Sequence, residues 1–179
     1  MTFEEKTLSS ERIYEGAILN LRKDLVTVIG EKTSYREIVE HRGGVTIAAI
    51  TDDKKMVLVR QFRKVAEKVV LEAPAGKIDH DEEDPQDAAV RELKEETGYS
   101  AAHMEHVTSF YSSIGYSEEV IHLYYAKGLT PGKTNYDDNE AIVVVEYDIA
   151  QLKEMVLAGE IEDGKTIAAI MIAAAKEGI

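Results

Sequence analysis

The segment 76–99 reads GKIDHDEEDPQDAAVRELKEETGY and constrains the fold of this chain more than any other part of it. Asp84 and Pro85 predict the start of a helix, because an aspartate N-cap accepts a hydrogen bond from a free backbone N–H and proline suits the first helical position. Asp87 complements the positive end of the helix dipole. Gly98 predicts the end of the helix, since glycine readily adopts the left-handed conformation.

Three glutamates, Glu92, Glu95 and Glu96, directly follow Arg91 on this predicted helix. Because successive residues of an α-helix are turned by ~100°, Glu92 and Glu96 lie within about 40° of each other, and Glu95 lies within about 60° of Glu92. Like charges crowded in this way cost free energy on an isolated helix. A hard divalent cation that takes oxygen ligands would turn that cost into a binding site.

Beside the carboxylates runs an apolar stripe that we expect to pack on a sheet while the carboxylates face a cleft. The stripe consists of Ala89, Val90, Leu93 and Thr97. The alternative is a solvated acidic helix, and Gly76 weighs against it, because a glycine before the helix lets backbone carbonyls approach a ligand closely. An EF-hand loop beginning at Asp79 is excluded, since its sixth and twelfth positions hold Asp84 and Val90 instead of Gly and Glu.

The whole segment resembles the Nudix hydrolase signature, which reads Gly, spacer, Glu, seven residues, then Arg-Glu-apolar-x-Glu-Glu-x-Gly-apolar. The positions that match in register are Glu83, Arg91, Glu92, Leu93, Glu95, Glu96, Gly98 and Tyr99. One departure is the spacer, because six residues separate Gly76 from Glu83 where the family has five. We interpret this as one extra residue in the loop 78–82.

The resemblance implies an α/β fold, a Nudix-type α/β/α sandwich with a mixed β-sheet, over residues 43–179. Residues from about 11 to 41 alternate in the manner of strands, and residues 1–42 are predicted to form a separate N-terminal antiparallel strand segment. Two apolar runs separated by a polar turn predict a hairpin of 45–50 with 56–61. Further strands are expected at 35–40, 69–71, 106–111, 120–126 and 141–147, and helices at 151–157 and 165–176.

Composition narrows the class of protein. The 179 residues include 34 acidic and 21 basic side chains, for a net charge of −13, which argues against nucleic acid as the main partner. Without cysteine, neither a disulfide framework nor a thiolate metal site can form. No apolar run approaches the ~20 residues of a membrane span, and the apolar segment 166–175 is interpreted as a buried helix. With no signal peptide in view, we expect a cytoplasmic protein.

Outside the signature, the chain resembles the ADP-ribose pyrophosphatase branch of the family in the stretches 36–41, 60–63, 72–77 and 113–119. This resemblance implies a substrate-binding set of Arg36, Glu37, Arg63, Gly115 and Glu119. Arg63 can offer a bidentate fork to a phosphate, and Arg36 can stack on a base. The alternative for each arginine is an ordinary charge at a strand edge or in a surface ion pair, and for the 112–119 loop a plain connection between strands.

By the same resemblance, the metal ligands are the Ala75 carbonyl, Glu92, Glu96 and Glu140. The catalytic set is Asp138, Glu95, Arg91 and Glu83, with Asp138 in the position of the proposed general base. That position usually holds Glu, so Asp shortens the reach by one methylene. Arg91 is expected to orient Glu83 or Glu95. For the segment 137–140, the residues alone favour a solvated turn. The cofactor expected is Mg²⁺, with Mn²⁺ as a substitute.

The predicted activity is a Mg²⁺-dependent cleavage of ADP-ribose to AMP and ribose 5-phosphate. Another nucleoside diphosphate sugar of the GDP-mannose type is the alternative substrate, and a sensor that binds ADP-ribose without hydrolysing it is the alternative class. The intact carboxylate set argues against the sensor. We expect a small-molecule substrate, no nucleic acid and no membrane as partners, and a homodimer in which residues 1–42 pack on or exchange with a second subunit.

Overall fold

The computed structural model describes residues 3–80, 82–134 and 141–179, and the chain divides into two compact units. The N-terminal unit comprises Met1–Gly43 together with Tyr111–Val120. The main unit comprises Gly44–Phe110 together with Ile121–Ile179. The segment 111–120, which the sequence placed in the larger domain, therefore belongs to the same compact unit as the N-terminal strands.

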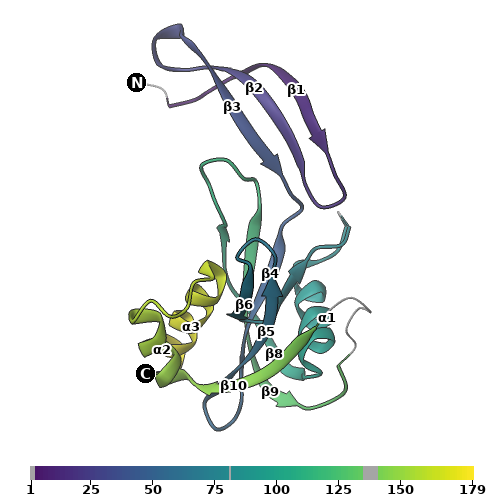
Figure 1. Cartoon of the computed structure of the whole chain (residues 1–179), viewed down its shortest axis with the longest axis vertical. Helices are drawn as coiled ribbons and strands as arrows, with labels where there is room; N and C mark the ends of the chain where they lie inside the picture. Colours follow the sequence, from purple (N-terminus) through teal and green to yellow (C-terminus); the bar gives the residue numbers. More distant parts are fainter. Residues whose placement is uncertain (1–2, 81, 135–140) are drawn as a thin grey trace. The chain divides into compact units, whose positions relative to one another are not determined.

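The N-terminal unit is built on a three-stranded antiparallel sheet (Figure 1). Its strands are β1 (Thr7–Glu15), β2 (Asn20–Thr27) and β3 (Thr33–Glu40), in that order across the sheet. A single 3-10 turn, η1 (Ile29–Glu31), joins β2 to β3, and Gly30 takes a φ of 74° within it, which glycine adopts at little cost. A parallel bridge from Val39 to Ser117 ties the 111–120 segment to this sheet.

The main unit contains, within its described residues, a seven-stranded mixed sheet in the order β10-β5-β4-β9-β8, with β6 paired to β5 and β7 paired to β4. The strands are β4 (Gly44–Ile50), β5 (Lys55–Arg63), β6 (Lys68–Glu72), β7 (Ala75–Lys77), β8 (Ser100–Tyr111), β9 (Val120–Thr130) and β10 (Ile142–Asp148). β4 runs parallel to β9 and antiparallel to β5. The predicted hairpin between β4 and β5 is confirmed.

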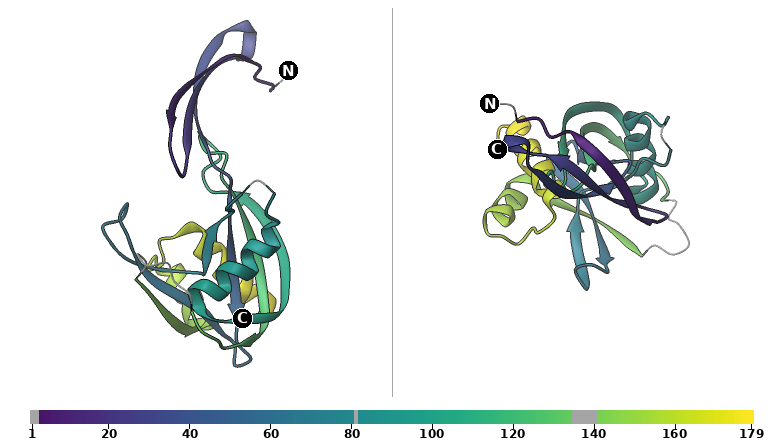
Figure 2. Two further views of the ribbon diagram at one scale, coloured as in Figure 1. Left: turned by 90° about the vertical axis from the view of Figure 1, so that its right-hand side faces the viewer. Right: turned by 90° about the horizontal axis from the view of Figure 1, so that it is seen from above.

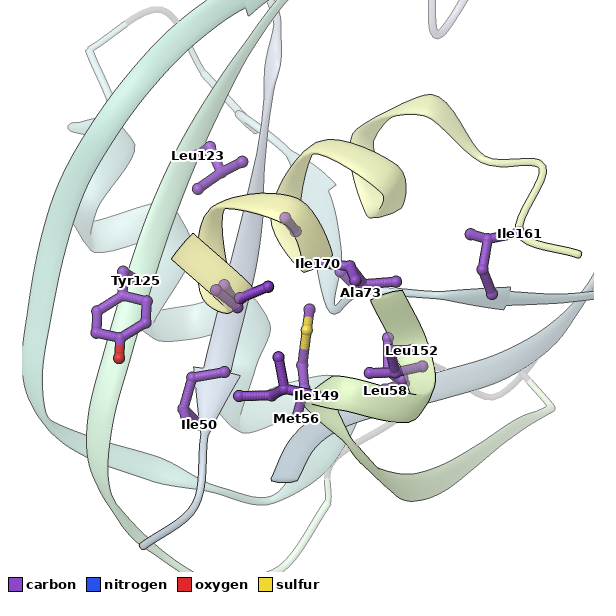
Figure 3. Close-up of a cluster of buried hydrophobic side chains, with 14 residues drawn as sticks. Ile50, Met56, Leu58, Ala73, Leu123, Tyr125, Ile149, Leu152, Ile161 and Ile170 are labelled. Carbon is purple, nitrogen blue, oxygen red and sulfur yellow. The ribbon is translucent and has the colours of Figure 1, made fainter. Parts of the chain in front are cut away.

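In the described part of the main unit, three helices cover the two faces of this sheet, with α1 (Pro85–Thr97) on one face and α2 (Ile149–Leu157) and α3 (Gly164–Glu177) on the other (Figures 1 and 2). The side chains of β4 alternate accordingly, so that Ile47 packs under α1 and Ile50 packs toward α2 and α3. The core on the second face is rich in large aliphatic side chains (Figure 3). It includes Ile50, Met56, Leu58, Leu123, Ile149, Leu152 and Ile170.

One strand was not predicted, and one local expectation was wrong. The stretch Ala75–Lys77 is a short strand, because β5 diverges from β4 and leaves the first residues of β4 free to pair with β7. Val90 was assigned to the packing stripe but is 50% exposed, whereas Ala88 is fully buried. The buried face of α1 is turned toward its glutamates, and it includes Glu96.

Candidate active site

Helix α1 has the ends that the sequence predicts. The Asp84 carboxylate accepts a hydrogen bond of 2.7 Å from the backbone N–H of Gln86, and Pro85 occupies the first turn. Gly98 takes a left-handed φ of 75°, and its N–H donates to the Lys94 carbonyl at 2.9 Å. With both ends specified, the positions of Arg91 and the glutamates around the helix axis are determined.

Arg91 is the centre of a carboxylate cluster. Its Nε donates to Glu83 Oε1 at 3.0 Å, and its Nη1 donates to Glu92 Oε1 at 2.7 Å and to Glu95 Oε2 at 3.2 Å. Its Nη2 also donates to the Lys77 carbonyl at 3.1 Å. The sequence left Glu83 and Glu95 as alternative partners of Arg91, and the structure brings both to it, together with Glu92.

Glu83 reaches Arg91 despite the longer spacer. Its Oε2 accepts a hydrogen bond of 2.7 Å from the Asp79 backbone N–H, which closes the loop before the helix. Burial raises the pKa of Glu83, but hydrogen bonds from Arg91 and the Asp79 backbone have a larger opposite effect and hold the pKa below its ordinary value. The neighbouring Glu82 is exposed, so the extra residue is accommodated in the loop.

Glu92 is pressed against the backbone of β7. A Cβ atom built on Gly76 would come within 1.9 Å of the Glu92 Cδ, so only glycine leaves room for this carboxylate. Burial raises the pKa of Glu92, and the charges of Glu95 and Asp79 add to this rise, while Arg91 opposes it. A carboxylate held in surroundings that disfavour its negative charge is suited to accept a cation.

Glu96 approaches the same stretch of backbone one turn further along α1. It is only 7% exposed, and its Oε2 accepts a hydrogen bond of 3.0 Å from the Ala75 N–H. The Ala75 carbonyl belongs to the peptide between Ala75 and Gly76, the two residues that Glu96 and Glu92 contact. Two carboxylates and a peptide group are therefore gathered at β7.

This donor set suits a hard divalent cation, because Mg²⁺ and Mn²⁺ take carboxylate and carbonyl oxygens. Over residues 3–80, 82–134 and 141–179, no group of three or more acidic or histidine side chains stands ready as a metal site. Mg²⁺ usually keeps several waters and takes phosphate oxygens from a substrate, so Glu92, Glu96 and the Ala75 carbonyl are a sufficient protein share. Glu140, the fourth expected ligand, and Asp138 lie outside the described residues.

Arg63 has a partner that the sequence did not suggest. Its Nε and Nη2 donate to the two carboxylate oxygens of Glu72 at 2.6 and 2.8 Å, and Glu72 is only 2% exposed. Lys165, on α3, donates to the same carboxylate at 2.6 Å. Glu72 and Lys165 are far apart in the chain, so no spacing pattern could have joined them.

The other expected substrate-binding residues lie in the N-terminal unit. Arg36 on β3 makes a two-pronged ion pair with Glu5, at 2.8 and 2.5 Å, and Glu37 beside it is exposed. Gly115 is exposed at the turn of the 111–120 segment, and a Cβ built on it would meet nothing within 4 Å. The Glu119 carboxylate lies 3.5 Å from His41 Nδ1. Within this unit, the strand β3 and the 111–120 segment thus carry four of the five expected residues.

None of the helices in the described part of the chain is long and apolar enough to cross a membrane.

The sequence of the chain is similar to those of several known proteins. A family model described as NUDIX domain matches residues 40–170. The chain is 40% identical, over 179 residues, to the methanol dehydrogenase activator of Bacillus methanolicus, covering 99% of this chain and 96% of that protein. It is 38% identical, over 180 residues, to the ADP-ribose pyrophosphatase of Bacillus subtilis strain 168, covering 99% and 97%.

Among solved structures, the fold is similar to that of a protein described as an ADP compounds hydrolase. The TM-score is 0.84 at 20% sequence identity, and the match covers 96% of this chain and 93% of the other. At that identity the likeness concerns the fold alone, and it confirms the predicted α/β/α sandwich.

Proposed function

The chain belongs to the Nudix hydrolase family, and from this premise we propose that it hydrolyses ADP-ribose to AMP and ribose 5-phosphate. As a Nudix hydrolase it is an enzyme that acts on a diphosphate. The choice of ADP-ribose is supported by its similarity, over nearly the whole length of both chains, to an ADP-ribose pyrophosphatase. A GDP-mannose type of substrate is the alternative, since the carboxylate helix acts on the diphosphate and does not select the base.

The observation that carries the proposal is the gathering of Glu92 and Glu96 at the Ala75–Gly76 peptide beside the Arg91 cluster. We propose that Glu92, Glu96, the Ala75 carbonyl and Glu140 hold Mg²⁺, with Mn²⁺ as a substitute. When bound, the metal supplies neutralisation of the diphosphate and a lower pKa for the attacking water. The family implies a divalent metal, and the all-oxygen donor set supports Mg²⁺.

The protein's own side chains orient the reacting groups. Arg91 holds Glu92 and Glu95 through one nitrogen, Nη1, and so keeps the Glu95 carboxylate close to that of Glu92, which lies against β7. Glu83 fixes the opposite edge of the Arg91 guanidinium. We assign to Asp138 the role of the general base, which accepts the proton of the attacking water at a carboxylate oxygen. Glu95 is the alternative base, since its carboxylate is partly exposed.

We propose that the remainder of the substrate is bound by the residues that the family resemblance assigns to it. Arg63 would donate to the diphosphate, and Arg36, Glu37, Gly115 and Glu119 would contact the nucleoside and terminal ribose. The bond from Arg36 to Glu5 would have to be exchanged for contact with the adenine ring. These roles are those that the family resemblance implies for residues at these positions.

A homodimer is also proposed. Large apolar side chains on the N-terminal sheet are exposed, among them Leu8 at 55%, Tyr14 at 57% and Tyr35 at 60%. A second copy of the chain packed on this sheet would bury such side chains. Light scattering should then give a particle of about 40 kDa, twice the 19.9 kDa chain, and a 20 kDa particle at micromolar concentration would refute the dimer. The cytoplasmic location stays a prediction.

The proposed activity is tested by incubating the purified protein with ADP-ribose, ADP-glucose or GDP-mannose, each with Mg²⁺, with Mn²⁺ or with EDTA. We expect AMP and ribose 5-phosphate from ADP-ribose with either metal and none with EDTA, and the highest kcat/KM for ADP-ribose. A clear preference for GDP-mannose would contradict ADP-ribose as the substrate, while the hydrolysis of a diphosphate would still stand. Binding of ADP-ribose without any turnover would favour the sensor.

A further inference from the structure

The Glu72 carboxylate is buried between two cationic side chains. It is 2% exposed, and its two oxygens accept hydrogen bonds from Arg63, while Oε2 also accepts one from Lys165. Burial raises the pKa of Glu72, but the two cations outweigh this effect and hold the pKa below its ordinary value. One cation is enough to pair with a carboxylate, so the second calls for an explanation.

The second cation is Lys165, in the first turn of α3, and this turn is held by hydrogen bonds to Asp163 and to the backbone of Ala73. Asp163 Oδ2 accepts hydrogen bonds from the Thr166 N–H at 3.0 Å, from the Thr166 hydroxyl at 2.5 Å and from Lys165 Nζ at 2.9 Å. The Thr166 hydroxyl oxygen in turn accepts a hydrogen bond of 2.8 Å from the Ala73 N–H. The start of α3 therefore holds both the side chain of Glu72 and the backbone just before β7.

This arrangement holds the Arg63 guanidinium by two of its three nitrogens. Glu72 takes Nε and Nη2, and no side chain or carbonyl in the described residues accepts a hydrogen bond from Nη1. The Arg63 side chain is 45% exposed, so Nη1 has access to solvent. Hydrogen bonding to Glu72 raises the pKa of Arg63. Glu72 ends β6, three residues before Ala75, where Glu96 and Glu92 meet the backbone of β7, so Arg63 is held on the segment that leads into the carboxylate site.

We propose that Lys165 is a positioning residue that holds the ionised Glu72 in place, so that Arg63 presents its Nη1 edge to the diphosphate of the substrate. This inference rests on the proposed function and adds Lys165 and Glu72 to its machinery. A guanidinium whose plane is set before binding loses less freedom when an anion arrives. With Lys165 sharing the Glu72 charge, Arg63 also keeps more of its own charge for the substrate.

Replacing Lys165 would leave Glu72 dependent on Arg63 alone. The buried carboxylate would then draw the guanidinium toward itself, because a buried charge without sufficient compensation is costly. The Nη1 edge would turn away from the substrate and its attraction for the diphosphate would weaken. The contact between Arg63 and the diphosphate stabilises the bound substrate and the transition state equally. Weakening it should therefore raise KM and leave kcat nearly unchanged.

The test is a double-mutant cycle of Lys165→Met and Arg63→Met, measured by steady-state kinetics with ADP-ribose. Titration calorimetry of ADP-ribose binding in EDTA supplies a second readout that needs no turnover. We expect Lys165→Met to raise KM and the EDTA dissociation constant about tenfold, the size expected when one charge-assisted contact is weakened, with kcat little changed. In the Arg63→Met background the same change should add nothing, because Lys165 acts through Arg63.

Two variants control for a purely structural role. Lys165→Arg keeps the cation and should restore KM, whereas Lys68→Met removes another lysine of the same unit, paired with the exposed Glu162, and should leave KM unchanged. If Lys165→Met does not fold, Lys165→Gln, which keeps a donor to Glu72 but no charge, takes its place. A thermal melt of each variant verifies that the fold is intact.

Unchanged KM and binding in folded Lys165→Met, or equal effects in both Arg63 backgrounds, would overturn the positioning role. If the wild-type protein binds ADP-ribose but does not hydrolyse it, the proposed activity fails, and the binding constants still decide the role of Lys165. If the wild-type protein does not bind ADP-ribose either, the inference falls with the activity.

Discussion

Two arginines, one in each unit, each donate hydrogen bonds to three carboxylates, yet the two clusters differ in their balance of charge. In the N-terminal unit, Arg22 donates to Asp24 at 3.2 Å, to Glu40 at 2.6 Å and to Glu118 at 2.6 Å. In the main unit, Arg91 does the same for three glutamates. The same type of contact thus occurs in both units, but the pKa of Glu40 is lowered and that of Glu92 is raised.

The difference lies in what the surroundings add. Glu40 has a second cation, Arg12, and these two arginines hold the pKa of Glu40 below its ordinary value. The pKa of Asp24 is also held below its ordinary value, by the Ser10 hydroxyl and Arg22, although its Oδ1 is buried without a hydrogen-bond partner in the described part of the chain. On α1, in contrast, burial raises the pKa of Glu92 in spite of Arg91. A compensated cluster ties segments of chain together, whereas a cluster with an excess of buried negative charge is prepared for a cation.

The largest expected effect separates the two clusters directly. Glu92→Gln or Glu96→Gln should lower kcat with Mg²⁺ by on the order of 10²–10⁴, because each removes a charge from the metal donor set and keeps the shape. Glu40→Gln, the matched change in the other cluster, should leave kcat unaltered. Near-wild-type turnover in both α1 variants would show that the excess charge there has no role in catalysis.

The next prediction concerns the acidic residues outside the described part of the chain. Asp138→Asn should lower kcat by about 10²–10⁴ with little change in KM, because a general base acts on the proton only in the transition state. Asp138→Glu should retain activity. Glu140→Gln should instead raise the Mg²⁺ concentration needed for the half-maximal rate. Full kcat in Asp138→Asn would move the base to Glu95 or Glu83.

Gly76→Ala tests whether the position of Glu92 matters as well as its charge. The added methyl group would overlap the end of the Glu92 side chain, which can move away, so the fold should survive. Because a displacement of about 1 Å at a reacting group can cost about 10²-fold, we expect a fall of that order in kcat and a melting temperature close to that of the wild type. A matched Gly164→Ala variant, where the Cβ meets nothing within 4 Å and no positive φ is imposed, serves as the control for an added methyl.

The smallest effect is expected from the compensated cluster itself. Arg22→Met should lower the free energy of unfolding by about 2–4 kcal/mol, since it removes two partly exposed ion pairs and a third to the buried Asp24, while Arg12 remains on Glu40. The kcat should not change. Urea unfolding followed by circular dichroism, together with the ADP-ribose assay, measures both quantities. A fall in kcat under conditions where the variant is still folded would show that the two clusters are not separate in function.

Local signals allowed much of this to be predicted from the sequence. The ends of α1 depend on Asp84, Pro85 and Gly98, and each acts within one turn of the helix. The β4–β5 hairpin depends on apolar runs on either side of a polar turn. The order of Arg91 and its glutamates along α1 determines which of them can share one guanidinium.

Other features were decided by contacts between distant parts of the chain. Val90 and Ala88 have similar local surroundings, and only the docking of α1 on the sheet buries one and exposes the other. The strand β7 exists because β4 has an unpaired edge at that point. The segment 111–120 joins the N-terminal unit through Val39 and Arg22, which precede it by many residues.

The sequence by itself therefore determined the family, the ends of the carboxylate helix and the spacing of its glutamates, because these depend on hydrogen bonds within one helical turn and on residue order. Only the tertiary structure decided which carboxylates are buried, which are paired and which remain in excess. Glu72 and Glu92 are both glutamates beside an arginine, yet Lys165 reaches the first and burial raises the pKa of the second. Burial and charge compensation depend on segments that meet only when the chain folds, and these two quantities distinguish a structural carboxylate from a reactive one.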